Sequence, residues 1–186
     1  MITMGTQISG LQKRYKTALE AGDGGGDVFY QLIATRAEGA GVASLAGDLT
    51  SLGANFSTQT TSTNCTGLVS GSTASYSGLA AKLMTPSSSW SPECNSSTSI
   101  DPATPSTYDM RVELGTTTKY TVFAKIVSTI DGNTGGDQNL LAPGVENANG
   151  GEVKMMDIPF LYAIEVVSEN SAKVDERAKL SILYQY

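Results

Sequence analysis

The first third of the chain carries apolar residues at the spacing of a helix. They recur at steps of three and four, as Tyr15, Ala18, Leu19, Gly22, Gly26, Phe29, Leu32 and Ile33. Steps of three and four place side chains on one face of a helix, so the pattern predicts a helical region over residues 7–56. A second helical piece is predicted within it, over 41–52.

Glycines interrupt this pattern between Ala21 and Asp27, at Gly22 and at three consecutive positions, 24–26. Each glycine inside a helix costs about 1 kcal/mol relative to alanine. Two interpretations remain open. In the first, the glycines form a soft segment or a groove where the sheet or a neighbouring subunit approaches the helix closely. In the second they have no such role: either tertiary packing tolerates poor helix formers, or the helix breaks and restarts with Asp27 as its N-cap. Alanines at compatible sites are expected to stabilise the helix by about 1 kcal/mol each.

The last third of the chain has the pattern of strands. Two segments rich in β-forming residues come first, 108–114 and 119–130, and a turn-like "GTTT" joins them. Two more such segments follow, 160–169 and 176–186, and "NSAKVD" joins these. In the final strand Leu180 and Ile182 alternate with polar residues, which marks one covered face. Short joins predict an antiparallel meander of about four strands over 107–186.

Helix first and sheet last is typical of the α+β class, with an N-terminal helix packed on the apolar face of a C-terminal antiparallel sheet. We expect Phe29, Leu32 and Ile33 to contact inward-facing strand residues such as Leu180 and Ile182. The length of 186 residues fits a single domain over 1–186.

Residues 57–106 are rich in Ser and Thr and are predicted as a loop region, with a short helix over 79–84 that Pro86 stops. Cys65 and Cys94 lie in this region. In an exported protein they would pair, and the cross-link would stabilise the fold by roughly 3–4 kcal/mol. The alternative is a pair of free buried thiols in a cytosolic protein. Their polar, loop-like surroundings favour a Cys65–Cys94 disulfide.

Composition narrows the functional classes. Charged residues make up 16% of the chain, the net charge is -6, and the twelve basic residues are scattered, which argues against a nucleic-acid partner. The chain has no histidine, so the commonest general base and metal ligand is missing. It has neither a P-loop nor a glycine fingerprint after a strand. We therefore expect no enzyme activity and no cofactor.

Two further features have competing interpretations. Asp131, Asn133 and Asp137 follow calcium-loop spacing, but Ala142 stands where the closing Glu belongs, which favours a hairpin loop over a metal site. Trp90 and the strand tyrosines, Tyr162, Tyr184 and Tyr186, are expected in the core or on sheet faces rather than as a platform for sugars.

The two ends of the chain resemble PilX-type minor pilins of type IV pili. Near the N-terminus the likeness rests on "ISG" (residues 8–10) and "ALEA" (residues 18–21), and near the C-terminus on the closing "VDERAKLSILYQY". "GDGG" (residues 22–25) stands where that family usually has Ala-Glu-Ala-Gly. The middle of the chain contributes nothing to the resemblance.

The resemblance implies a pilus subunit whose N-terminal transmembrane helix is absent from this sequence, since no apolar run approaches the roughly 18 residues of a membrane span. Its expected role is to initiate the filament or lie at its tip, with adhesion as one option. Its expected partners are other minor pilins, the major pilin and a tip adhesin, with the membrane reached only through the missing helix.

The expected location is the extracellular pilus, reached through the bacterial inner membrane. The residues implied in helix packing and assembly are Gly22, Gly26, Phe29, Leu32 and Ile33. Two alternatives remain, a pseudopilin of a type II secretion system and a secreted surface- or carbohydrate-binding module rich in β-structure.

Overall fold

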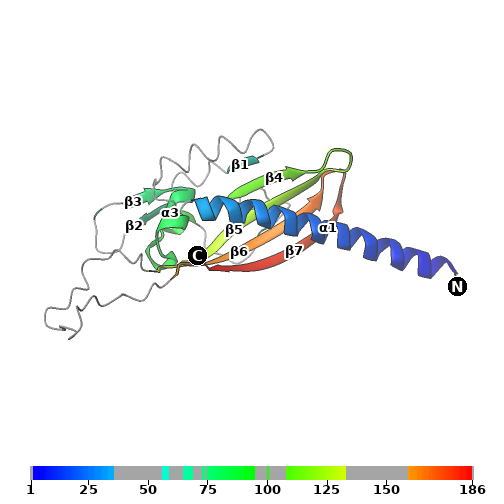
Figure 1. The fold of residues 1–186 in the computed structure, drawn as a ribbon, viewed down its shortest axis with the longest axis horizontal. Coiled ribbons are helices and arrows are strands. Elements are labelled where there is room, and N and C mark those ends of the chain that lie inside the picture. The colour runs from blue at the N-terminus through cyan, green and yellow to red at the C-terminus, as the bar shows by residue number, and fades with distance from the viewer. Residues whose placement is uncertain are drawn as a thin grey trace, which may run out of the picture.

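The structure, a computed structural model, describes residues 2–35, 56–58, 65–68, 73, 75–94, 100, 108–132 and 159–185. One long helix, α1 (Ile2–Thr35), lies across a five-stranded antiparallel sheet (Figure 1). The strands follow the spatial order β1 (Phe56–Thr58), β4 (Met110–Leu114), β5 (Tyr120–Ile130), β6 (Leu161–Asn170) and β7 (Lys173–Gln185). The predicted α+β class, with an N-terminal helix on a C-terminal sheet, is confirmed.

The four C-terminal strands form the predicted meander, and two details of the prediction were wrong. β7 begins at Lys173 rather than at 176, so the turn after β6 is only Ser171 and Ala172. β1 adds a fifth strand outside β4, with Phe56 opposite Val112. β1 was missed because it lies across the boundary between the predicted helical region and the predicted loop region. Its three residues are also too few to show an alternating pattern.

Helix α1 is continuous through its glycines. The helix runs unbroken from Ile2 to Thr35, and Asp27 lies exposed inside it rather than at an N-cap. The restart interpretation was therefore wrong. The C-terminal half of α1 packs on the sheet, and the N-terminal half extends past the end of the strands (Figure 1).

The core lies between α1 and the sheet. Phe29, Leu32 and Ile33 are buried and share one apolar cluster with the half-buried Leu180 and Ile182. The cluster also holds the inward-facing residues of the central strands, among them Val122, Ala124, Ile126, Tyr162, Ile164 and Val166. The helix therefore buries the face that its apolar spacing predicts.

A small unit rich in turns packs at the end of the sheet where α1 ends (Figure 1). It contains the hairpin β2 (Thr66–Leu68) and β3 (Ser75–Ser77), the helix α3 (Leu79–Met84) and the 3-10 turns η2 (Ser87–Ser89) and η3 (Pro92–Cys94). The short helix was predicted, whereas the hairpin lies in a region predicted as loop. The predicted helical piece over 41–52 lies outside the described residues.

The predicted disulfide is confirmed. Cys65 and Cys94 are bonded, with their Cα atoms 4.4 Å apart. Both cysteines are buried beside Ala81 of α3. The Ser91 amide donates to the Thr66 carbonyl at 2.8 Å, so a backbone hydrogen bond ties the same two segments together.

Candidate assembly surface on helix α1

Helix α1 approaches the sheet so closely that a Cβ at three of its glycine positions would meet a strand side chain at 3.0 Å or less. A Cβ at Gly22 would lie 2.5 Å from Leu180 Cδ1, one at Gly25 would lie 2.5 Å from Val122 Cγ1, and one at Gly26 would lie 3.0 Å from Ile182 Cδ1. Real Cβ atoms essentially never come under 3.0 Å to another heavy atom. The glycines therefore set the distance between helix and sheet.

Gly25 is the tightest of these positions and was missed by the sequence reasoning. The Cβ added there would meet three atoms of Val122, a stiff β-branched side chain with no exposed surface. The signal was present, because Gly25 lies three residues after Gly22 and four before Phe29 and so shares their face. Gly24 points elsewhere, and its nearest neighbour would be Leu114 Cδ1 at an ordinary 3.8 Å.

Alanine is therefore expected to stabilise this helix at some glycine positions and to destabilise the protein at others. We expect Gly25→Ala to lower the free energy of unfolding by roughly 1–3 kcal/mol, because Val122 has no free volume into which to move. Gly24→Ala is the matched control and should raise it by up to about 1 kcal/mol, since alanine is the better helix former. Urea denaturation of the two variants measures both effects, and equal stabilisation by both would contradict the close approach.

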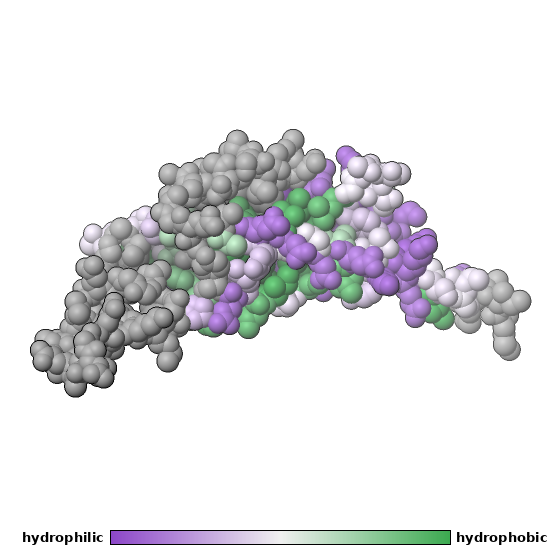
Figure 2. Space-filling view, in the orientation of Figure 1, coloured by the Kyte–Doolittle hydropathy of each residue, from purple (hydrophilic) through white to green (hydrophobic). Residues whose placement is uncertain are grey.

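The apolar face of α1 continues past the end of the sheet. Leu11 and Tyr15 precede the buried Ala18 by seven and three residues, and Ile8 precedes Tyr15 by seven, so all lie on the side that faces the sheet further along. Their exposed fractions are 56% for Ile8, 64% for Leu11 and 54% for Tyr15. We call these three residues the apolar stripe. Figure 2 shows hydrophobic atoms on this projecting part of the molecule.

The helix leaves the sheet over a polar joint. A groove of about 700 Å³ lies there, and it is lined by Arg14 and Thr17 of α1, the turn 117–120, the turn 170–173 and Glu176. The carboxylate of Glu176 lies 3.3 Å from Arg14 Nε and accepts a hydrogen bond from Asn170 Nδ2 at 3.0 Å. One turn further on, Ser168 Oγ donates to the carbonyl of Ala18 at 2.5 Å. These contacts fix the direction in which the projecting half of α1 points.

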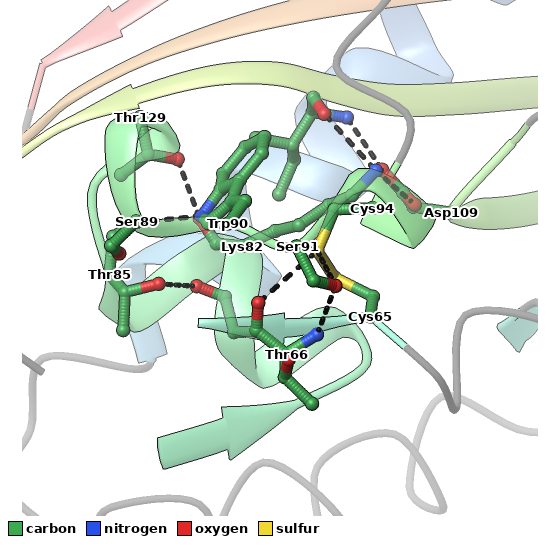
Figure 3. Close-up of a disulfide and its surroundings, with 12 residues drawn as sticks. Cys65, Thr66, Lys82, Thr85, Ser89, Trp90, Ser91, Cys94, Asp109 and Thr129 are labelled. Carbon is green, nitrogen blue, oxygen red and sulfur yellow. Dashed lines mark hydrogen bonds and ion pairs between the residues drawn. A yellow bond between two sulfur atoms is a disulfide. The ribbon is translucent and has the colours of Figure 1, made fainter. Parts of the chain in front are cut away.

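A buried ion pair joins the disulfide-linked unit to the sheet (Figure 3). Lys82 Nζ of α3 lies 2.8 Å from both carboxylate oxygens of Asp109 and donates to the Ile126 carbonyl at 3.3 Å. The Ile126 amide donates in turn to Asp109 Oδ2 at 2.8 Å. Burial raises the pKa of Asp109, and the charge and hydrogen bonds of Lys82 and the Ile126 amide oppose that rise.

The aromatic residues of this region pack as expected for a core. Trp90 is half-buried, its Nε1 donates to the Thr85 carbonyl at 3.1 Å, and Lys82 Nζ lies 5.7 Å from its ring centre. Tyr162 is fully buried, and its hydroxyl donates to the Leu83 carbonyl at 2.9 Å. Tyr184 is half-buried and stacks on Tyr162, and Tyr186 lies outside the described residues.

The candidate metal ligands are not brought together in the described part of the chain. Asp131 lies directly after β5 and is half-buried, whereas Asn133 and Asp137 lie outside the described residues. Among the described residues, no three His, Cys, Asp or Glu side chains are grouped so that they could hold a metal ion. The choice between hairpin loop and metal site at 131–137 stays a prediction.

No helix in the described ranges is both long enough and apolar enough to span a membrane. Comparisons with protein-family models, with curated proteins and with solved structures found no match to the chain.

Proposed function

We propose that this chain is the headgroup of a minor pilin, a structural subunit that assembles into a type IV pilus through helix α1. The observation that carries the proposal is the apolar stripe. The face that α1 buries against its own sheet continues past the sheet, where Ile8, Leu11 and Tyr15 are each more than half exposed.

Burial of this stripe supplies a driving force for assembly. Removing a large apolar side chain from water is worth about 1.5–3 kcal/mol, so three such residues on one helix face favour a partner that covers them. A helix neighbour is the natural partner, because residues spaced by three and four present a ridge that packs into the groove of another helix. The sheet and the joint at Glu176 hold that ridge clear of the headgroup.

The rest of the fold suits the same role. The disulfide-linked unit lies at the other end of the molecule from the projecting half of α1, where it would face outward from a helix-led filament (Figure 1). A disulfide fits an extracellular location, because such bonds persist in oxidising compartments. Under this proposal the partners are other minor pilins, the major pilin and a tip adhesin, and a preceding apolar segment of about 20 residues holds the subunit in the membrane before assembly.

The test is a complementation assay in a strain that lacks the gene. The full-length gene with Ile8→Gln, Leu11→Gln and Tyr15→Gln is expected to yield at least about tenfold fewer surface filaments, since each 1.4 kcal/mol of lost association energy is a factor of ten. Ser9→Gln is the matched control, because it introduces the same side chain at an exposed site of α1 outside the stripe. The stability of both purified headgroups should match the wild type.

Each contrary result has a definite meaning. Wild-type filament numbers from the triple variant would contradict the proposed role of the stripe. Loss of protein secretion with intact pili would assign the chain to a secretion system. Full rescue by residues 1–186 alone would identify a secreted binding module, because that fragment lacks a membrane anchor under the proposal.

A further inference from the structure

The outward side of α1 carries a second regular pattern, made of charges. Lys13, Lys16, Glu20, Asp23 and Asp27 follow one another at steps of three, four, three and four, and all five are exposed. Steps of this kind form one line along a helix. The line runs opposite to the face that buries Ala18 and Phe29. We call these five residues the charged stripe.

The stripe holds nearly all the charge of the helix and sorts it by sign. α1 has six charged residues, and the sixth, Arg14, is turned toward Glu176 at the joint. Along the stripe two lysines come first and three acids follow. The lysines lie on either side of Arg14, at the joint where the helix leaves the sheet, and the acids lie along the half that the sheet supports.

Contacts within one chain use little of this charge. Lys16 Nζ lies 3.8 Å from Glu20 Oε1, with both side chains largely exposed, and such an exposed pair contributes little to stability. In the part of the chain that the structure describes, no ion pair involves Lys13, Asp23 or Asp27. The stripe therefore presents a positive and a negative segment to whatever lies beside it.

We propose that the charged stripe is the docking surface for a second copy of this chain, parallel to the first and shifted along the helix axis by seven to eleven residues. A shift of seven places Lys13 and Lys16 of one copy beside Glu20 and Asp23 of its neighbour. A shift of ten to eleven places them beside Asp23 and Asp27. With a rise of 1.5 Å per residue, the offset is about 10–16 Å.

The parallel direction rests on the proposed function, because subunits anchored by their N-terminal segments in one membrane all point the same way. Given that direction, the charges select the offset. Without a shift, lysine faces lysine and acid faces acid, and like charges across a contact are repulsive. The shift places both lysines of one copy beside acids of its neighbour. At a shift of seven, Glu20 of the first copy still lies beside Asp27 of the second, whereas at ten to eleven Glu20 lies beside the uncharged positions 30 and 31, so the charges favour the larger shift. Either shift brings the projecting half of one helix onto the supported half of the next.

The stripe determines register and not affinity. Exposed ion pairs contribute far less than the cost of bringing two proteins together. The holding energy comes from apolar burial and from confinement in the membrane, whereas charge complementarity suppresses wrong alignments. A test must therefore supply the confinement.

The experiment tethers residues 1–186 by an N-terminal histidine tag to vesicles that contain a nickel-chelating lipid, so that all copies point the same way. Copies labelled at the C-terminus with a donor or an acceptor fluorophore report proximity by energy transfer. At low salt we expect transfer above that of randomly placed molecules at the same density. At about 1 M salt the screening length is about 3 Å, and the excess should vanish.

Charge reversal tests the stripe directly. Lys13→Glu with Lys16→Glu makes the stripe wholly acidic, and Glu20→Lys, Asp23→Lys and Asp27→Lys makes it wholly basic. Each variant alone should lose the excess transfer, and an equimolar mixture of the two should regain it. Arg177→Glu with Thr116→Glu and Gln185→Glu is the matched control, with the same change of net charge at exposed sites outside α1 and outside the joint. It should keep the wild-type signal.

Zero-length cross-linking of amines to carboxylates then reads the offset. In a mixture of ¹⁴N- and ¹⁵N-labelled chains, mixed-isotope products identify bonds between copies. We expect them to join Lys13 or Lys16 to Glu20, Asp23 or Asp27, and the Lys13 partner decides between the smaller and the larger shift. Transfer that is insensitive to salt and to both reversals, or mixed-isotope products confined to other residues, would overturn the proposal.

This outcome is separable from that of the complementation assay. The vesicle experiment measures contact between two copies, whatever the cell uses them for. Loss of the charge-dependent contact would leave the role of the apolar stripe intact. Conversely, a strain whose pili do not depend on the gene would remove the pilus assignment and leave a measured contact in place.

Discussion

Replacing Lys82 by methionine is expected to lower the free energy of unfolding by about 3–5 kcal/mol at neutral pH. The ammonium group of Lys82 is the charge partner of Asp109, and the exposed fractions of the two side chains are only 2% and 5%. Methionine has a similar volume, so packing changes little. The carboxylate of Asp109 would remain buried with the Ile126 amide and the weaker effect of the Lys125 charge left to stabilise it. Denaturant unfolding at pH 7 measures the loss.

The same substitution should make stability depend on pH in a defined direction. Burial already raises the pKa of Asp109, and Lys82 is the first of the groups that oppose the rise. Without Lys82 the pKa of the folded state rises further above that of the unfolded state. The protonated, neutral acid is then favoured by folding, so stability is fully present below the unfolded pKa and is lost as pH rises through the folded pKa. The deficit of Lys82→Met should therefore shrink toward pH 4.

Asparagine at position 109 provides the control. In the double variant Lys82→Met with Asp109→Asn, the side-chain oxygen can still accept the Ile126 amide and no charge is buried. Much of the lost stability should return, because replacing both members of a buried pair costs far less than removing one. A deficit that is the same at every pH, or the same in the single and double variants, would show that shape rather than charge matters at this site.

Local sequence pattern was sufficient where local geometry determines the structure. Alternation along the final strand, 176–186, and the short joins predicted the meander, because side chains on a strand point to alternate faces. Steps of three and four predicted which face of α1 is buried. Prediction failed at β1, whose three residues pair with β4 through contacts more than fifty positions away in the sequence.

Tertiary contacts also explain the continuity of α1 and the burial of Lys82 in α3, neither of which could be predicted from the local sequence. Helix propensity disfavours each glycine by about 1 kcal/mol, yet Gly22 and Gly25 lie where the sheet needs space, so packing outweighs propensity and α1 stays continuous. Lys82 in "LAAKLM" has the local pattern of an exposed lysine. Its burial depends on Asp109, 27 residues further on, and no spacing rule connects the two.

Reduction of the Cys65–Cys94 disulfide is expected to cost about 3–4 kcal/mol. The bond closes a loop between residues 29 apart, and a cross-link of that size removes conformational freedom chiefly from the unfolded chain. For a chain of this length each kcal/mol corresponds to about 2–4 °C in Tm, so thermal unfolding should occur roughly 10 °C lower. Calorimetry with and without a reductant measures the shift.

The variant Cys65→Ala with Cys94→Ala is the control, since a reductant should not change its Tm. The disulfide joins the two ends of the small unit, and the Lys82–Asp109 pair links that unit to the sheet through α3. Their losses should therefore not add. Once the disulfide is reduced, Lys82→Met should cost less than it does in the oxidised protein, because the unit that holds Lys82 in place is already loosened. Full additivity would instead mean that the two links act on separate parts of the fold.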